Sequence, residues 1–355
     1  MSILRFIPLL ALLLVGCGTS STRDDGAYNA MHVPVSGDFA GAPGVDAFIA
    51  RMRQHGYSPE RTAAILSGAR RQQSIIDLMD QQAPSKSTGP TGAWTRYRAK
   101  FLGEDSINNG VAFWRRNEAA LDRAAAHYGV PPEYIVAIIG VETRYGGFTG
   151  KTRIIDALAT LAFAYPRRAE YFTGELENFL IMAREENIDP FAPRGSFAGA
   201  MGLGQFMPSS FRDHAVDHDG DGHRDLWNPA DAIGSVANYF RHHGWQPGEA
   251  VAVRASVESP AAARALKSGF NTSYGLNELA GRGIKPTRAL GRTGTVSLLE
   301  LDAQGGYEYW LGLKNFYVIT RYNHSTYYAM AVHQLAQAIR SRKDAPDGTR
   351  VSSTW

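Results

Sequence analysis

One apolar segment constrains the fold more than any other, because a helix of its composition has to be buried. Residues 130–147 contain two prolines at the start and two glycines at the end, which are typical of the limits of a helix. Glu142 lies near the C-terminal end, and helical spacing places it on the same face as Ile135 and Ile139. Burial and the negative end of the helix dipole both disfavour ionisation, so the pattern predicts an acid that can donate a proton near neutral pH. The alternative is a structural carboxylate neutralised by Arg144 or another base.

The N-terminal residues indicate export and membrane anchoring. A basic residue, a short apolar run and Gly16-Cys17 follow one another, as in a cleaved signal peptide, and the run is too short to span a membrane comfortably. This stretch resembles a bacterial lipoprotein signal, in which residues 1–16 are removed and Cys17 is lipid-modified. An ordinary secretory signal is the alternative, although Cys17 is the only cysteine in the chain, which leaves no internal disulfide. Residues 17–43 are mostly small and polar and are predicted to form a tether.

The rest of the chain has a globular composition, with 44% hydrophobic and 20% charged residues, and is long enough for two or three subdomains. The formal net charge is +3 and there is no lysine or arginine run, so nothing indicates nucleic-acid binding. We predict a mainly α (α+β) fold. Helical periodicity covers residues 45–80, 94–102, 109–128, 154–164, 170–186, 230–243 and 327–340. Extended segments are expected at residues 251–254, 296–301, 307–310 and 316–319, with a hairpin turn at residues 304–306.

A second motif is the run of glycine and alanine in residues 195–209. Small residues allow a bulky ligand to approach the backbone, and Ser196 and Gln205 offer the neutral hydrogen bonds that sugars require. The run lacks the glycine and lysine spacing of a phosphate-binding loop. Tight helix packing through small residues is the alternative, but it does not require Gln205.

A third motif has the spacing of a metal-binding loop. Asp217, Asp219, Asp221 and Asp225 occupy positions one, three, five and nine, a glycine occupies position six, and His223 would offer its carbonyl, as in an EF-hand. Position twelve is an asparagine in place of the usual glutamate. A solvated acidic turn is the alternative, but four alternating aspartates repel one another without a cation.

Several motifs together resemble the membrane-bound lytic murein transglycosylase B family, glycoside hydrolase family 103. The resemblance extends over nearly all the mature chain and is carried by residues 140–146, 165–169, 197–209, 232–240 and 321–325. It implies a lysozyme-like core of residues 127–248 and 311–340, a helical N-terminal subdomain of residues 44–126, and a small β subdomain of residues 249–310.

The resemblance also implies a lyase that cleaves the β-1,4 bond between N-acetylmuramic acid and N-acetylglucosamine in peptidoglycan without adding water. Glu142 would protonate the leaving oxygen and then act as base on the C6 hydroxyl, which closes a 1,6-anhydro ring. No second acid lies in either core motif, so a substrate acetamido group would stabilise the positive charge. By position, the substrate-binding residues would be Tyr97, Arg167, Arg168, Ser196, Gln205, Tyr239, Tyr322, Asn323 and Tyr328. The two arginines are expected to meet peptide-stem carboxylates, and each tyrosine could instead be a core aromatic.

The family loop is longer than an EF-hand loop, and by resemblance its closing acid is Asp231. Structural Ca²⁺ is therefore expected in the loop of residues 217–231. Its expected ligands are Asp217, Asp219, Asp221, His223 and Asp231, whereas Asp225 is not counted as a direct ligand. No organic cofactor is expected. The expected partners are peptidoglycan glycan strands, and penicillin-binding proteins are candidate protein partners. The chain is expected to be a monomer and to bind no nucleic acid. By resemblance to bacterial lipoproteins, Gly18 after the cysteine in place of an aspartate favours the periplasmic face of the outer membrane.

Two other functions are weighed against this prediction. A non-catalytic peptidoglycan-binding lipoprotein would have no need to keep Glu142, Ser196 and Gln205 together. A hydrolytic muramidase would deliver water and would normally need a second carboxylate near the cleft. The products formed from purified peptidoglycan distinguish the three.

Overall fold

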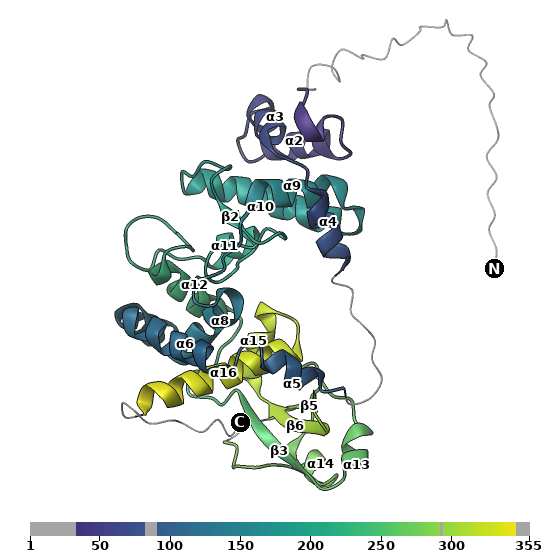
Figure 1. The fold of residues 1–355 in the computed structure, drawn as a ribbon, viewed down its shortest axis with the longest axis vertical. Coiled ribbons are helices and arrows are strands. Elements are labelled where there is room, and N and C mark those ends of the chain that lie inside the picture. Colours follow the sequence, from purple (N-terminus) through teal and green to yellow (C-terminus); the bar gives the residue numbers. More distant parts are fainter. Residues whose placement is uncertain (1–32, 82–90, 292–293, 346–355) are drawn as a thin grey trace, which may run out of the picture.

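The computed structural model describes residues 33–81, 91–291 and 294–345 and is mainly α-helical (Figure 1). The predicted signal peptide and Cys17 lie outside the described residues. The helices are η1 (Gly37–Phe39), α2 (Val45–Arg53), α3 (Pro59–Gly68), α4 (Gln73–Asp80), α5 (Ala93–Arg98), α6 (Glu104–Arg116), α7 (Glu118–Tyr128), α8 (Pro132–Thr143), α9 (Ile154–Ala164), η2 (Pro166–Arg168), α10 (Ala169–Glu185), α11 (Pro208–His214), α12 (Pro229–His242), α13 (Pro260–Arg264), α14 (Leu276–Ala280), α15 (Lys314–Tyr322) and α16 (Thr326–Asp344). None of these helices is both long enough and apolar enough to cross a bilayer.

Helix α8 is the predicted buried helix, and it lies among α6, α7, α12 and α16. Pro132 occupies its first turn, where proline costs no hydrogen bond because a backbone N–H at this position would have no acceptor within the helix. Its isoleucines are fully buried, and the helix ends at Thr143 because Arg144 adopts a left-handed conformation with φ of 49°. The sequence-based helix is thereby confirmed, and Glu142 is placed one residue from its end.

The small β-containing insertion is also confirmed. Strands β3 (Ala252–Val257), β4 (Ile284–Pro286), β5 (Ser297–Ala303) and β6 (Gly306–Gly312) form an antiparallel sheet in the order β4-β3-β6-β5. The predicted hairpin joins β5 to β6, with Ala303 opposite Gly306. The sheet has its own apolar cluster and lies at the opposite end of the molecule from α2 and α3 (Figure 1). A second, two-stranded sheet pairs β1 (Thr152–Arg153) with β2 (Arg194–Gly195).

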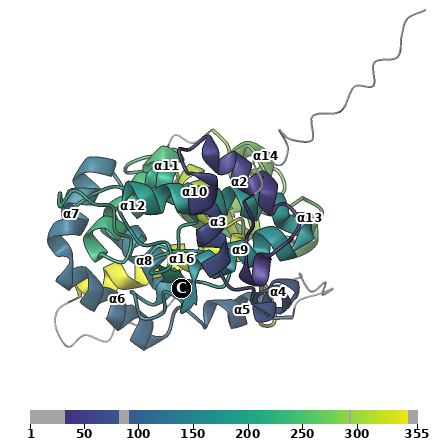
Figure 2. The ribbon, with the colours of Figure 1, turned by 90° about the horizontal axis from the view of Figure 1, so that it is seen from above.

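The predicted single subdomain of residues 44–126 is wrong, because its helices pack in three places. Helices α2 to α4 lie with α9 and α10, whereas α5 packs on β5 and α16. Helices α6 and α7 pack around α8, α12 and α16, and in the view from above they lie apart from α2 to α4 (Figure 2). The folded part also starts before residue 44, since Phe39 is 1% exposed and its ring centre lies 5.7 Å from that of Phe163. The predicted tether of residues 17–43 is therefore too long.

Two local predictions need correction. Residues 316–319, expected to be extended, belong to helix α15, in which Phe316, Val318 and Ile319 are buried. A short run of aromatic and β-branched residues fits a strand, but burial against α16 and β6 selects the helix. The expected helix of residues 109–128 is interrupted at Asn117, whose side chain donates to the carbonyl of Phe113 at 2.8 Å.

Candidate active site

Glu142 meets a tyrosine, and no cation pairs with it among the described residues. The hydroxyl of Tyr328 donates to Glu142 Oε1 at 2.5 Å, and the guanidinium of Arg144 lies 5.2 Å from the ring centre of Phe148 instead. Burial raises the pKa of Glu142 to about 7, and the hydrogen bond from Tyr328 opposes that shift. Neutralisation by Arg144, the alternative for this acid, is wrong. The carboxyl is therefore divided between its neutral and charged forms near pH 7.

Glu142 opens into a cavity of about 410 Å³. The lining residues are Glu142, Ser196, Phe197, Ala198, Ala200, Gln205, Phe206, Met207, Ser210, Tyr239, Tyr322 and Asn323. Six of the predicted site residues thus come together from α8, the glycine-rich segment, α12 and the end of α15. Glu142 is the only acid in this lining, while amides, hydroxyls and aromatic rings make up its other polar and planar surface. Such a surface suits a neutral, hydroxyl-rich ligand.

The glycine-rich segment is a tight turn that places Gln205 in the cavity wall. Met201 and Phe206 exchange backbone hydrogen bonds of 2.9 and 3.1 Å around it, and Gln205 has a φ of 53°. The amide nitrogen of Gln205 donates to the carbonyls of Gly202 and Thr149 at 2.9 and 3.2 Å. Both amide hydrogens are thereby used, and among the described residues no donor reaches its Oε1. That oxygen is left as an acceptor for a ligand hydroxyl or amide.

Close backbone approach explains why this region is rich in glycine. A Cβ on Gly150 would lie 1.9 Å from the carbonyl oxygen of Gly195, and one on Gly202 would lie 2.4 Å from the carbonyl oxygen of Leu226. Packing through small residues is therefore one function of the segment. Ser196 is also structural in part, because its Oγ accepts from the N–H of Ala200 at 3.0 Å.

The four predicted tyrosines surround Glu142 in different ways. Tyr322 donates to the carbonyl of Gly204 at 2.6 Å, and Tyr239 donates to the carbonyl of Arg321 at 2.6 Å, so both hydroxyls have backbone partners. Tyr97 is only partly buried and does not line the cavity. Its pKa is raised by burial and, secondarily, by the charge of Glu142. The pKa of Tyr328 is raised well above its usual value by burial and by Glu142, which keeps it a donor.

Arg167 and Arg168 do not line this cavity. Arg167 is exposed and pairs with Asp80 at 3.0 Å, while the guanidinium of Arg168 lies 4.5 Å from the ring centre of Tyr171. Both lie in helix η2, and their expected contact with peptide-stem carboxylates stays a prediction. A residue missed by sequence reasoning is Thr143, whose buried Oγ1 lies 2.9 Å from the carbonyl oxygen of Leu203. Its position next to Glu142 was the available signal.

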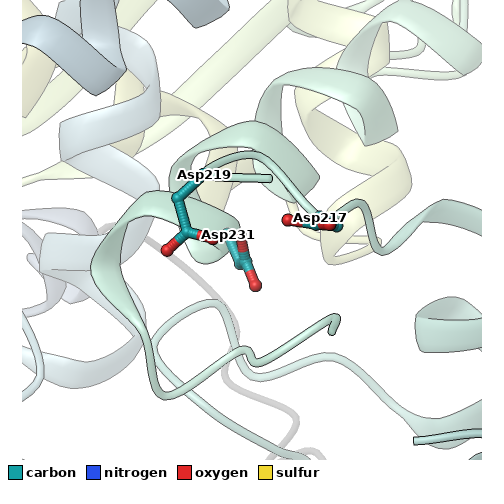
Figure 3. A group of neighbouring side chains, drawn as sticks. All are labelled: Asp217, Asp219 and Asp231. Atoms are coloured by element: carbon teal, nitrogen blue, oxygen red, sulfur yellow. The ribbon is translucent and has the colours of Figure 1, made fainter. Parts of the chain in front are cut away.

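The acidic loop gathers three of its four predicted carboxylate ligands. Carboxylate oxygens of Asp217, Asp219 and Asp231 lie within 4.8 Å of one another, and Figure 3 shows the three side chains side by side. Asp231 is fully buried, and burial raises its pKa. Asp221 lies outside this group, and its Oδ1 accepts from the N–H of His223 at 2.9 Å. A set of hard oxygen donors around a buried carboxylate fits a cation such as Ca²⁺.

Backbone bonds inside the loop orient these acids. Asp217 accepts from the N–H groups of Gly220 and Gly222 at 2.7 and 2.8 Å, which lowers its pKa. Asp231 accepts from the N–H groups of His218 and Asp225 at 2.7 and 2.8 Å. The loop also meets the glycine-rich segment, because Leu203 N–H donates to the carbonyl of Leu226 at 2.8 Å. This bond joins the end of the loop to the segment that carries Gln205.

Comparison with known proteins finds close relatives along nearly the whole chain. Residues 40–337 match the transglycosylase SLT domain family. The membrane-bound lytic murein transglycosylase B of Escherichia coli K12 is 53% identical over 357 aligned positions, which cover 94% of this chain and 97% of that protein. Two structures of the E. coli lytic transglycosylase Slt35, one in complex with bulgecin A and one with calcium, superpose with a TM-score of 0.83. Each is 56% identical and covers 89% of this chain and 98% of the other. SltB3 of Pseudomonas aeruginosa, solved with NAG-anhNAM-pentapeptide, has a TM-score of 0.73 at 29% identity, covering 83% of this chain and 78% of that one.

Proposed function

The chain belongs to the membrane-bound lytic murein transglycosylase B family and is a lytic transglycosylase acting on peptidoglycan, and from this premise we propose that Glu142 alone supplies its acid and base chemistry. The observation that carries the proposal is a single carboxyl in the cavity, with a pKa of about 7 and a tyrosine hydroxyl at 2.5 Å. Such a carboxyl can start the reaction as an acid and continue it as a base.

In the first step neutral Glu142 gives its proton to the glycosidic oxygen, and the bond from that oxygen to C1 of N-acetylmuramic acid breaks. Positive charge develops at C1, and without a second carboxylate in the lining the substrate acetamido group stabilises it. In the second step the Glu142 carboxylate removes the proton of the C6 hydroxyl, and O6 bonds to C1. The products are a 1,6-anhydro end and a free 4-hydroxyl, and Glu142 regains its proton without consuming water.

The other cavity residues hold the sugars for this sequence. Ser196 and Gln205 contact the sugar near the acetamido group, with Gln205 Oε1 accepting from a substrate hydroxyl or amide, and Asn323 lines the cleft with Tyr322. Tyr239 and Tyr322 supply planar surface for sugar rings, and Tyr97 contributes at the edge. The donated hydrogen bond from Tyr328 stabilises the Glu142 anion between the two steps.

Product analysis tests the proposal. Wild-type protein incubated with purified peptidoglycan should release 1,6-anhydromuropeptides, identified by mass spectrometry, and Glu142→Gln should release none. Reducing ends in place of anhydro ends would establish a hydrolytic muramidase. Binding without release of soluble fragments by wild-type protein would establish a non-catalytic binding protein.

The acidic loop is proposed to hold structural Ca²⁺ through Asp217, Asp219 and Asp231, with the carbonyl of His223 and the carboxylate of Asp221 as further candidate ligands. The calcium complex of the E. coli relative and the grouped oxygens of this chain both support it. Bound cation offsets the repulsion among the acids and stabilises the folded state by mass action. Its contribution is to stability, since none of these aspartates lines the cavity with Glu142.

Lipid attachment at Cys17 is proposed to hold the enzyme at the periplasmic face of the outer membrane. The membrane-bound E. coli relative and the lipoprotein-like sequence before Cys17 support this location. Cys17→Ala should release the protein from the membrane fraction while leaving its activity on purified peptidoglycan unchanged. Recovery of the variant in the membrane fraction would overturn the anchor.

A further inference from the structure

Three histidines lie together where helices α11 and α12 end. His214 is the last residue of α11, His242 is the last residue of α12, and His243 follows it. The ring centre of His214 lies 4.6 Å from that of His242 and 5.4 Å from that of His243, and the rings of His242 and His243 are also 5.4 Å apart. The two helices pack against each other, so the fold holds the three rings as one cluster.

The spacing of the rings is that of imidazole ligands on one metal ion. With metal–nitrogen bonds of about 2.0–2.1 Å and tetrahedral angles, the ring centres of two such ligands lie about 5 Å apart. The observed separations of 4.6 and 5.4 Å lie on either side of this value. In the described conformation no choice of one nitrogen per ring brings all three within 4.8 Å of one another, so binding requires a change of rotamer. His242 is exposed and can make such a change without disturbing the core.

His214 supplies a buried nitrogen that the fold leaves unused. The residue is 6% exposed, and its Nδ1 makes no hydrogen bond of ordinary geometry in the described part of the chain. Most buried polar atoms in native proteins have a partner, because an unsatisfied one costs free energy. The backbone here is held in place, since the side-chain amide of Asn238 donates to the carbonyl of His214 at 2.9 Å. Ligation of a metal ion satisfies the unused nitrogen.

The surroundings keep these histidines neutral, as metal ligation requires. Burial lowers the pKa of His214 and lowers that of His243 to about 4, and the neighbouring histidines add to both shifts. The cluster also lies at the C-terminal ends of two helices, where the negative end of the helix dipole favours a cation. Nearby charges act in both directions, because Arg321 opposes a cation near His243 and Asp213 favours one near His214.

We propose that His214, His242 and His243 bind a divalent transition-metal ion, Zn²⁺, with water completing the coordination. Imidazole nitrogen suits Zn²⁺, whereas Ca²⁺ and Mg²⁺ prefer oxygen ligands, so the site differs in kind from the carboxylates of the acidic loop. The bound ion joins the ends of α11 and α12 and stabilises the folded chain by mass action. The site is independent of the proposed function, because none of the three histidines lines the cavity with Glu142.

Zinc titration tests the proposal. The probe is Zn²⁺ alone, titrated by calorimetry near neutral pH into protein that has no polyhistidine tag, with excess Ca²⁺ present to occupy the acidic loop. The test variants are His242→Ala and His243→Gln. The matched control is His127→Ala, which removes another exposed histidine from the last turn of a helix, α7. His242 and His127 are exposed, so neither change should affect folding, and thermal melts without Zn²⁺ check this.

We expect wild-type protein to bind one Zn²⁺ per chain and to show a higher Tm when Zn²⁺ is added. His242→Ala and His243→Gln should each weaken binding at least about tenfold, and His127→Ala should leave it within about twofold. Absent binding by wild-type protein, or wild-type affinity in either test variant, overturns the proposal. The anhydro-product assay with Glu142→Gln reports on the proposed function separately, because zinc binding requires no turnover.

Discussion

The hydroxyl of Tyr328, in the first turn of α16, donates a hydrogen bond of 2.5 Å to Oε1 of Glu142, at the end of α8, across 186 positions of sequence. Two opposing effects act on that carboxyl. Burial favours its neutral form, the hydrogen bond favours its charged form, and burial dominates, with the pKa of Glu142 raised to about 7. This balance allows one group to give up and recover a proton at neutral pH.

The first prediction concerns the pH dependence of catalysis. Because the proposed reaction starts from protonated Glu142, kcat/KM on peptidoglycan should fall as the pH rises through about 7. Tyr328→Phe removes the hydrogen bond that lowers this pKa, so the falling limb should move to higher pH, and loss of a charge-assisted bond should slow the reaction about tenfold to a hundredfold. Rates measured between pH 5 and pH 9 test this. Tyr327→Phe is the control, and an unmoved limb in Tyr328→Phe contradicts the prediction.

The second prediction concerns the stability cost of the same acid. Glu142 has a pKa of about 7 when folded and 4.5 in its ordinary state, so between these values the folded protein binds more protons than the unfolded chain. The free energy of unfolding therefore falls as the pH rises from about 4.5 through about 7. Glu142→Gln does not ionise and should exceed wild type by about 1–3 kcal/mol at pH 8, with little of this gain at pH 4.5.

Denaturant titrations at the two pH values measure that difference. Glu170→Gln, at an exposed glutamate of α10, should show no comparable gain and serves as control. An equal gain for Glu142→Gln at pH 4.5 and pH 8 would argue against the raised pKa.

The third prediction concerns the acidic loop. For a site with a dissociation constant of about 10⁻⁴ to 10⁻³ M, 10 mM Ca²⁺ should stabilise the protein by about 1–3 kcal/mol, or a few degrees in Tm. Asp217→Ala should abolish this response, because Asp217 belongs to the group of three carboxylates. Asp221→Ala, at an acid outside that group, should retain more of it. Thermal melts with Ca²⁺ and with EDTA provide the measurement, and a wild-type Tm that Ca²⁺ leaves unchanged excludes the site.

The fourth prediction concerns the backbone contact behind the cavity wall. Gly150 has a φ of 98°, and a Cβ there would lie 2.5 Å from the N–H nitrogen of Ser196 and nearer still to the carbonyl of Gly195. Gly150→Ala should therefore cost more than about 3 kcal/mol and lower activity by displacing Ser196. Gly174→Ala in α10, with nothing within 4 Å and ordinary φ, should be neutral or stabilise by about 0.5–1 kcal/mol. Similar unfolding midpoints for the two variants would refute the prediction.

Local signals in the sequence predicted the positions at which proline or glycine allows a helix to begin or the chain to turn. Prolines near residue 131 predicted the start of α8, which ends at Thr143, three residues before the predicted stop at Gly146, and Gln304-Gly305-Gly306 predicted the β5–β6 hairpin. Residues 316–319 were predicted wrongly because four residues carry too little periodicity to separate a strand from a buried helix. Likewise, nothing in the sequence of residues 44–126 reveals that its helices cover three different surfaces, since each apolar stripe is compatible with several partners.

Sequence patterns alone predicted the groups on which the proposed chemistry depends: an acid on an apolar helix, a glycine-rich segment with Ser196 and Gln205, and aspartates at alternating positions. These patterns are local, because helical periodicity, turn residues and ligand spacing act over a few positions. Three findings required the folded chain: Tyr328 contacts Glu142, Arg144 does not, and Arg167 and Arg168 lie outside the cavity lining. Such contacts join distant segments, and their geometry follows from the packing of α8, α15 and α16 as whole bodies, which no short stretch of sequence specifies.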